Sequence, residues 1–318
     1  MQQGKLIVNE NAEDEIKLLL GGVIPEREDE MSEYLKQYAP HIARCDDRPG
    51  FTIEAGSFGI LKFTQRTMHQ MWILGFAANQ ALHSYSTMLA ILRLHVGELD
   101  TNELDQIPDQ STEEEKYSKL INAVYDLGKV NDTSEFSWPN EVPKPEDRKP
   151  KDIEGAATFD LICMSGAYVF LHEMKHIAFS QDNNAPSNPH EEEFECDAYA
   201  KSMMLDKLET YSKDSGYDLS RLYTKRSMSI ALALFYMLII TPIEAWGGTE
   251  SHPSIKGRIE SLVDGLPIPD DDILWLYMSS LFLSHLRLIN KEHLKIKFSS
   301  LRMLTMRLVS EIEKASNN

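Results

Sequence analysis

The hydrophobic pattern of the first third of the chain predicts a small sheet followed by a long helix. Apolar positions alternate or cluster at residues 51–55 and 60–63, on either side of a Gly-Ser-Phe-Gly loop, which is typical of a β-hairpin. From 64 to 94 apolar residues recur at helical spacing with few breakers, which predicts a long and mostly buried helix. A shorter helix is predicted at 28–38, and a turn at 46–50 closes this part of the chain.

The next part of the chain is more polar. Residues 97–115 are rich in Asp, Glu, Asn and Gln and are predicted to form a solvated acidic loop. A short helix is predicted at 116–127. The stretch 137–152 holds four prolines in sixteen residues, so we expect a semi-rigid linker or an ordered crossing loop there.

Helical patterns dominate from residue 153 to the C-terminus. They are interrupted by polar, glycine-containing or proline-containing stretches at 181–189, 214–217, 247–252 and 265–270. The apolar run at 230–240 stops at Thr241-Pro242, short of the roughly 20 residues that cross a bilayer. We therefore expect this run to be a buried core helix.

These patterns predict a mainly α (α+β) fold with a small β-hairpin or sheet and a helical C-terminal part. The predicted organisation is a mixed α/β region at 1–136, a core region at 137–265 and a helical segment at 266–318. One continuous domain that joins all of them is the alternative. A hydrophobic content of 42% with 9% aromatic residues is that of a folded protein, so disorder is not expected.

Charge and cysteine content narrow the class of function. The chain has 50 acidic and 32 basic residues and a net charge of -18, whereas binding to nucleic acid needs clustered Lys and Arg. Residues 1–20 lack the basic start and long apolar stretch of a signal peptide, so neither export nor a membrane location is expected. Cys45, Cys163 and Cys196 fit neither a disulfide framework nor a cysteine zinc site. The expected compartment is reducing and cytoplasmic.

The motif that carries chemistry is His172-Glu173-Met174-Lys175-His176, an H-E-x-x-H sequence inside an apolar stretch. Residues four apart share one face of a helix, so both imidazoles can point at one metal ion with Glu173 beside it. A catalytic Zn²⁺ has three protein ligands and an open position for water, and Glu173 would take a proton from that water. A chance motif on an exposed helix is the alternative. The apolar surroundings favour burial and metal binding instead.

The third ligand is expected on the next helix, beyond the break at 181–189. Glu193-Phe-Glu-Cys-Asp197 matches the E-x-x-x-D pattern that supplies the third ligand in many glutamate-type zincins, and its two carboxylates share a helix face. Glu193 would bind the metal, and Asp197 would accept the free ring N–H of a ligating histidine. An acid-rich helix start favoured by the helix dipole is the non-functional explanation. The alternative ligands are Glu192, His190 and Glu195.

A later segment, His252-Pro253-Ser-Ile-Lys-Gly-Arg258-Ile259, resembles the third box of peptidases that share the E-x-x-x-D arrangement. A helix start with Pro253 at its first position is another interpretation, and both can hold. His252 is expected to approach the substrate carbonyl and to stabilise the oxyanion. Arg258 is expected to pair with a carboxylate of the site.

With these boxes the chain resembles the Lit-type phage-exclusion peptidases, which are HExxH metallopeptidases of the U49 type. The resemblance covers residues 138–262 well and 51–94 more weakly. It rests on four stretches in order, namely Trp138-Pro139 with Pro143-Lys144-Pro145-Glu146, the box at 172–176, residues 193–200, and His252-Pro253 to Ile259.

The resemblance implies a cytoplasmic zinc peptidase of bacteria that stays inactive until a phage product triggers it. It also implies a protein substrate, elongation factor Tu, whose cleavage halts translation before the phage spreads. Met174 and Lys175 fill the variable positions of the motif differently, and no box matches beyond Leu262. The resemblance therefore supports the metal chemistry of this chain more directly than it supports the target or the trigger.

The sequence thus predicts a zincin-like fold whose peptidase core at 137–265 holds Zn²⁺ through His172, His176 and Glu193. The predicted activity is that of a latent and selective endopeptidase, with a protein substrate and a phage-derived trigger as partners, and without nucleic acid or membrane. The alternatives are a regulatory metallopeptidase that cleaves a repressor or toxin partner, and a binding protein whose zinc site only braces the fold. A structural zinc has four protein ligands, whereas a catalytic zinc keeps a position for water, so site geometry distinguishes the last from the others.

Overall fold

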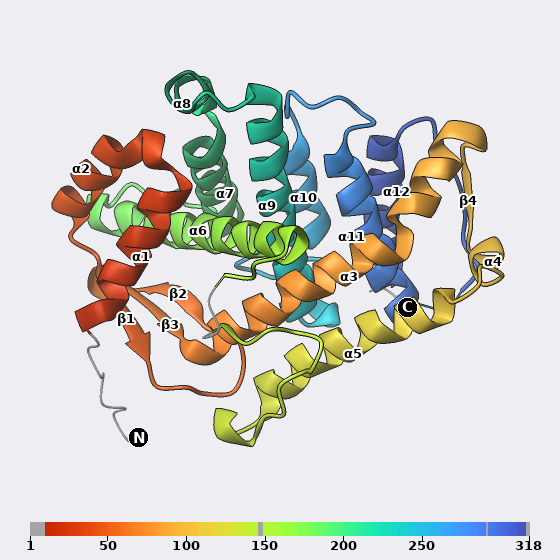
Figure 1. Cartoon of the computed structure of the whole chain (residues 1–318). Helices are drawn as coiled ribbons and strands as arrows, with labels where there is room; N and C mark the ends of the chain where they lie inside the picture. Colours follow the sequence, from red (N-terminus) through yellow and green to blue (C-terminus); the bar gives the residue numbers. More distant parts are fainter. Residues whose placement is uncertain (1–9, 146–148, 291, 316–318) are drawn as a thin grey trace.

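Two long helices, α3 (Gln65–His95) and α6 (Ile153–Asp182), cross near the middle of the molecule (Figure 1). At the crossing a Cβ on Gly75 of α3 would lie 2.2 Å from Ile162 Cγ1 of α6. The missing side chain of Gly75 therefore allows the close approach of the two helices. The computed structural model describes residues 10–145, 149–290 and 292–315.

A small sheet packs against α6 and consists of β1 (His41–Cys45), β2 (Ile53–Gly56) and β3 (Ile60–Thr64). The strand order is β1-β3-β2, with β1 parallel and β2 antiparallel to β3. Phe63 of β3 meets Phe170 of α6 edge to face, with 5.4 Å between ring centroids. The predicted hairpin and the helix after it are confirmed. Strand β1 is missing from the prediction because its short sequence does not alternate and its partner is a strand beyond the hairpin turn.

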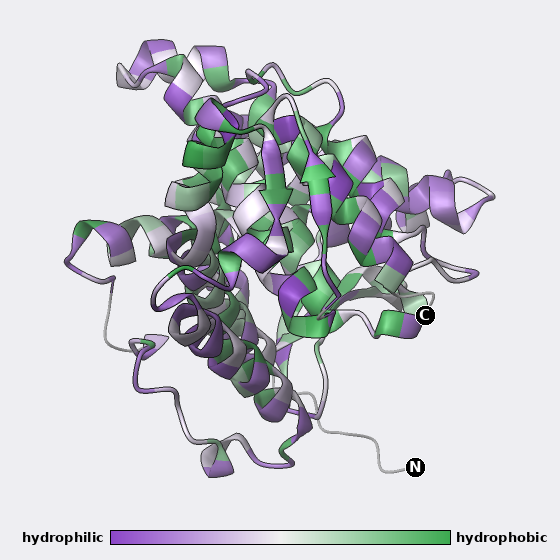
Figure 2. Ribbon diagram, turned by 90° about the vertical axis from the view of Figure 1, so that its right-hand side faces the viewer, coloured by the Kyte–Doolittle hydropathy of each residue, from purple (hydrophilic) through white to green (hydrophobic). Residues whose placement is uncertain are grey.

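The other helices surround this frame, with α5 and α11 packed on α3, and with α7 and α9 packed on α6. In Figure 2 the hydrophobic parts of the helices gather towards the interior. The predicted helix at 28–38 is confirmed as α2. The bounds are α1 (Glu10–Val23), α2 (Glu28–Tyr38), α4 (Thr101–Leu104), α5 (Gln110–Lys129), α7 (Pro189–Leu205), α8 (Leu208–Ser215), α9 (Leu219–Ile240), α10 (Ile255–Val263), α11 (Ile273–Ile289) and α12 (Leu301–Ala315).

The prediction of an acidic loop at 97–115 is wrong. This stretch contains β4 (Glu98–Asp100), helix α4 and the start of α5, and β4 pairs antiparallel with β5 (Lys295–Lys297). The reason lies in Leu99 and Leu104, which are completely or almost completely buried although their neighbours are polar. The helix predicted at 116–127 is confirmed as part of the longer α5.

The proline-rich stretch 137–152 is an ordered crossing loop wherever it is described. The indole of Trp138 donates a hydrogen bond to the carbonyl of Val142 at 2.8 Å, and the indole of Trp72 donates to that of Pro143 at 2.7 Å. These bonds attach the loop to itself and to α3. The described residues leave out 146–148 and 316–318. They also leave out 1–9, the first part of the stretch 1–20 that was considered for a signal peptide.

One hydrophobic cluster includes Ala12, Phe170 and Ile312, so all three regions proposed from the sequence contribute to the same core. The boundaries after 136 and 265 stay predictions. By length and composition alone α6 and α9 could cross a membrane, but here they pack against each other. The prediction of a buried core helix at 230–240 is confirmed by α9, in which Phe235 is fully buried.

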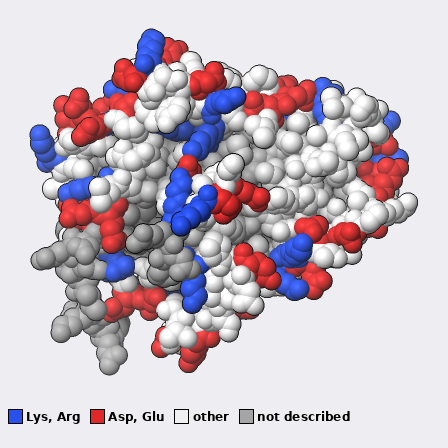
Figure 3. Space-filling model, in the orientation of Figure 1, with Lys and Arg blue, Asp and Glu red and all other residues white. Residues whose placement is uncertain are grey.

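Charged side chains of both signs are mixed on the face of the molecule in Figure 3. Opposite charges also pair directly, since Lys149 and Lys225 both contact Asp160, at 2.5 and 2.8 Å. The expectation that the chain does not bind nucleic acid stays a prediction.

The Gly75 crossing predicts a specific cost of adding one methyl group. Gly75→Ala would push a Cβ into Ile162 in a packed interior, so we expect a loss of about 1–3 kcal/mol in the free energy of unfolding, measured by urea denaturation. Gly21→Ala is the matched control, because no atom lies within 4 Å of its added Cβ, and it should not destabilise the protein. Ile162→Ala should cost less in the Gly75→Ala background than in the wild type. Equal free energies of unfolding for Gly75→Ala and Gly21→Ala would contradict this account.

Candidate metal centre

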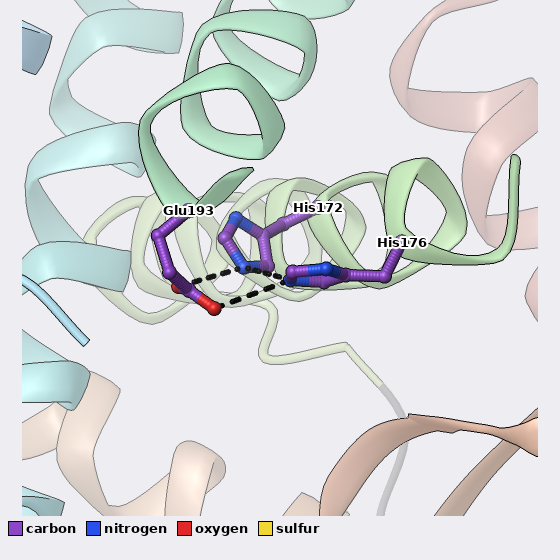
Figure 4. Close-up of side chains that lie close together, drawn as sticks. All are labelled: His172, His176 and Glu193. Carbon is purple, nitrogen blue, oxygen red and sulfur yellow. Dashed lines mark hydrogen bonds and ion pairs between the residues drawn. The ribbon is translucent and has the colours of Figure 1, made fainter. Parts of the chain in front are cut away.

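Helix α6 presents the two histidines of the H-E-x-x-H motif on one face. The helix begins at Ile153, where the Asp152 side chain accepts a hydrogen bond from the Gly155 N–H at 2.6 Å, and it continues unbroken through the motif. The ring centroids of His172 and His176 lie 5.0 Å apart. Both point towards the carboxylate of Glu193, as Figure 4 shows.

Nε2 of each histidine lies close to the other Nε2 and to a different oxygen of the Glu193 carboxylate. The two Nε2 atoms of His172 and His176 are 3.3 Å apart. The oxygens of Glu193 lie 3.3 Å from Nε2 of His176 and 3.5 Å from Nε2 of His172. Ligands about 2.0–2.1 Å from a tetrahedral ion are separated by roughly 3.3–3.4 Å. These residues therefore have the geometry of a group that can hold a metal ion.

The other ring nitrogen of each histidine lies beside a carboxylate. Nδ1 of His172 is 3.0 Å from Asp197, and Nδ1 of His176 is 2.7 Å from Glu192. A carboxylate at Nδ1 keeps the proton there, so the lone pair of Nε2 is free to face a metal. From the sequence, Glu192 is expected only as an alternative ligand, and its contact with His176 is not predicted.

Helix α7 brings these carboxylates to α6. Asn188 caps it by accepting a hydrogen bond from the His190 N–H at 3.0 Å, and Pro189 occupies its first turn. Glu193 and Asp197 then follow one turn apart on the face towards α6, and both are buried. His190 instead lies next to the carbonyl of Thr249, with 2.8 Å between Nε2 and that oxygen.

The buried charges strongly affect protonation at the site. Burial opposes protonation of His172 and His176, but carboxylates outweigh it and raise the pKa of each ring to about 9. For Glu193 burial favours the neutral acid, yet the two imidazoles hold its pKa far below the usual range. Without a metal, the carboxylates therefore favour protonation of these rings. A metal ion has to displace these protons, so its affinity should increase with pH.

Arg258 of α10 holds the carboxylates of α7 in place. Its guanidinium donates two hydrogen bonds of 2.7 Å to Asp197 and lies 3.2 Å from Glu193. Burial would raise the pKa of Asp197, but Arg258 and, after it, His172 lower it to about 2. Asp197 also accepts a hydrogen bond of 3.0 Å from the hydroxyl of Tyr168, which sits one turn before His172. The sequence analysis did not predict this contact. Tyr168 lies four residues before His172, so the helical spacing could have indicated that both face the same carboxylate.

The loop before α10 places His252 at the edge of the site. Its side chain is 59% exposed, and Nε2 lies 3.7 Å from Glu193. The Thr249 hydroxyl accepts the His252 N–H, and the Thr249 N–H donates to the His252 carbonyl at 2.8 Å. Gly248 makes this tight turn possible at a φ of 99°, where a Cβ would lie 3.1–3.3 Å from backbone atoms. The helix itself starts at Ile255 with Ser254 as its cap, so the interpretation of Pro253 as the first helical residue is wrong.

Glu173 is positioned by the small sheet. Its Oε2 accepts a hydrogen bond of 2.6 Å from the N–H of Ala55 on β2, a contact that the sequence did not reveal. Burial raises the pKa of the Glu173 carboxyl above its usual range. Glu173 and His252 both line a cavity of about 190 Å³, together with ligand residues His172 and Glu193.

The pairing of Arg258 predicts a pH-dependent contribution to stability. Arg258→Met would leave Asp197 buried without its main partner, so we expect a loss of about 3–5 kcal/mol in the free energy of unfolding at pH 7. Asp197 has a depressed pKa in the folded state, so this stabilisation exists above pH 4 and is lost as the pH falls towards 2. Urea denaturation across this range should show the gap between wild type and variant closing. Arg258→Lys, which keeps the charge but not the fork, should lie between them. A gap independent of pH would contradict this assignment.

The comparisons with known proteins bear on what this site does. Neither the comparison with curated proteins nor that with solved structures gave a match. The comparison with protein families matched residues 61–278 to Peptidase U49. The matched stretch runs from within β3 into α11 and includes the candidate metal centre and Arg258. Because the match covers more than half of the chain, we conclude that this protein belongs to the Peptidase U49 family and is a peptidase.

Proposed function

We propose that this peptidase is a zinc-dependent endopeptidase. The observation that carries the proposal is the group formed by Nε2 of His172, Nε2 of His176 and the carboxylate of Glu193, with Glu173 beside it. Two imidazoles and one carboxylate are a ligand set that catalytic zinc sites use, and carboxylates at both Nδ1 atoms suit neutral histidine ligands. When bound, the ion would polarise the scissile carbonyl and lower the pKa of the attacking water.

The number of ligands favours a catalytic over a structural site. Among the described residues, the group that could hold a metal contains three side chains, and a structural zinc has four protein ligands. The ligand residues His172 and Glu193 also line the cavity of about 190 Å³, which offers room for water and substrate. This arrangement supports a peptidase over a protein that uses zinc only to brace its fold.

Glu173 is the residue we assign to proton transfer. Its raised pKa brings the carboxylate closer to the range in which it can take a proton from water and return it to the leaving amine. The N–H of Ala55 binds Oε2 and fixes the direction of the carboxylate, leaving Oε1 to accept the proton. His252, exposed at the edge of the cavity, can donate a hydrogen bond to the oxyanion.

We further propose that the peptidase acts in the bacterial cytoplasm as a latent defence protein. The support is the resemblance to Lit-type peptidases together with membership in the U49 family. A cytoplasmic protease of broad activity would be lethal, so it should act on one or few protein targets and only after a phage-derived trigger. Elongation factor Tu is the target that the resemblance favours. A repressor or toxin partner is the alternative target.

The proposed metal site predicts about one equivalent of zinc per chain, measured by mass spectrometry of the purified protein. Replacing His172 or His176 with Ala should remove the metal, because two remaining ligands rarely hold Zn²⁺ against a chelator. Glu193→Ala should weaken binding severely, whereas Asp197→Ala should cost about 10- to 100-fold in affinity or activity. Protein that stays metal-free after zinc reconstitution would refute the proposal, and negligible effects of both carboxylate variants would mean that another face of α7 supplies the ligand.

The proposed biology predicts a phenotype that depends on Glu173. Bacteria that express the wild type should resist some members of a phage panel, and Glu173→Gln, which keeps the metal ligands, should abolish this resistance. A new fragment of elongation factor Tu on blots from infected cells would support that target. Resistance without the fragment would favour the alternative target. Resistance that survives Glu173→Gln would favour a non-hydrolytic binding protein.

A further inference from the structure

A groove with a volume of about 870 Å³ lies between α1, the first half of α6, the end of α8 and the start of α9. We call it the α1 groove. It reaches along α6 as far as Met164, about two helical turns before His172, so it is separate from the candidate metal centre. Its floor is apolar and consists of residues that also pack in or against the hydrophobic core, namely Leu19, Val23, Phe159, Met164 and Leu222.

Apolar side chains at the rim of the α1 groove are uncovered. Leu18 of α1 is 76% exposed, Tyr217 in the turn after α8 is 61% exposed, and both line the groove. Apolar surface that gathers around a hollow between charged side chains is typical of a site that another molecule covers. A small molecule inside the groove would leave Leu18 largely in water, whereas a partner chain would bury it. The rim therefore favours a partner of protein size.

Helix α1 presents a face that suits close packing of a second helix. Glu15, Leu18, Leu19 and Gly22 have helical spacing and share the face that lines the groove. Gly21 and Gly22 lie in the last turn of α1 without a positive φ, and no atom lies within 4 Å of a Cβ added to either. The chain itself therefore does not need a glycine at these positions, although glycine weakens a helix. At Gly22 the missing side chain instead leaves room in the groove for the backbone of a partner.

Two walls of the α1 groove carry charges without a partner. Glu15 lies on the α1 wall and Arg221 on the α9 wall, and neither side chain pairs with another of the described residues. Lys225, one turn after Arg221, differs because it contacts Asp160 at 2.8 Å. A molecule that carries the same two charges in the reverse arrangement would pair with both walls.

We propose that the α1 groove is a dimer interface, in which it binds α1 of a second copy of this chain. The two copies would be related by a twofold axis, so each offers the same surface to the other. Leu18 of each copy enters the apolar floor of the other, Glu15 pairs with Arg221 of the second copy, and Gly22 allows the two α1 helices to approach. The inference goes beyond the peptidase activity and does not depend on a metal ion.

The size and lining of the groove agree with a second α1 as its occupant. A helix about 10 Å in diameter fills roughly 850 Å³ over two turns, and the stretch from Glu15 to Gly22 makes about two turns. The groove of about 870 Å³ has room for this stretch. Its apolar floor, its unpaired base and the space beside Gly22 each have a counterpart on that stretch. This self-complementarity selects a second copy over an unrelated protein.

The test is the mass of the full-length protein in sedimentation equilibrium over a dilution series. The mass of the wild type should pass from the 36.3 kDa of one chain towards twice this value as the concentration rises. Leu18→Glu places a charge in the apolar floor of the other copy and should keep the protein monomeric over the same range. Because Leu18 is exposed in the single chain, the circular dichroism spectrum should not change.

Two neighbouring glycines supply a matched pair of variants. Gly22→Leu fills the groove and should raise the dissociation constant of the dimer at least about 10-fold. Gly21→Leu adds the same side chain at a residue that does not line the groove, so the dissociation constant should stay within about 3-fold of the wild type. Both variants should fold, because the space around each added Cβ is open and Leu is the better helix former.

Exchange of the two charges tests the predicted pairing directly. Glu15→Arg and Arg221→Glu should each weaken the dimer about 10-fold, because like charges then meet across the interface. The double variant restores opposite charges and should regain the wild-type affinity within about 3-fold. Lys213→Glu changes a charge on α8 outside the groove and should leave the affinity unchanged.

A wild type that stays monomeric at every concentration would overturn the inference. A dimer that Leu18→Glu leaves intact would also overturn it, because the contact would then lie elsewhere on the molecule. Equal effects of Gly22→Leu and Gly21→Leu, or a double charge variant that binds more weakly than both single variants, would show that the α1 groove does not hold the second copy.

Discussion

The ion pair between Asp197 and Arg258 is the interaction on which the rest of the site depends. It joins α7 to α10, and through the Tyr168 hydroxyl and the His172 ring it also joins both to α6. A buried carboxylate is costly unless charge and hydrogen bonds compensate it, and here a guanidinium fork, a phenol and an imidazole surround one side chain. Each helix is thus fixed at the point where it supplies a functional group.

The same cluster explains why the site is suited to a dication. The carboxylates of Glu192, Glu193 and Asp197 surround two imidazoles, and among the described residues Arg258 supplies the permanent positive charge that pairs with them. Protons on the imidazoles balance part of this negative charge, as their raised pKa indicates. A metal ion would replace these protons by a charge located between the ligands. Binding of a metal would therefore be coupled to proton release and to the stability of the folded state at this site.

The sequence could predict those parts of the site that depend on spacing along one helix. Four-residue intervals place His172 with His176, and Glu193 with Asp197, whatever the rest of the fold does. Membership in the U49 family also follows from the boxes in the sequence and is confirmed. The contact of Glu192 with His176 depends instead on how α7 rotates against α6, and β4 is recognisable only with β5 in place. Such contacts between distant segments leave no periodic signal in the chain.

The small sheet matters to the proposed chemistry because Glu173, the residue proposed to transfer the proton, depends on it. Glu173 lies on α6, but the N–H that fixes its carboxylate belongs to Ala55, and Phe51 and Ile53 line the cavity that it faces. Packing of Phe63 on α6 keeps the hairpin at this distance. A fragment limited to residues 137–265 would keep every proposed metal ligand and lose this support. The proposed metal binding and the proposed catalysis therefore have different structural requirements, since the candidate ligands come from α6 and α7 whereas the orientation of Glu173 and the lining of the cavity also need the sheet.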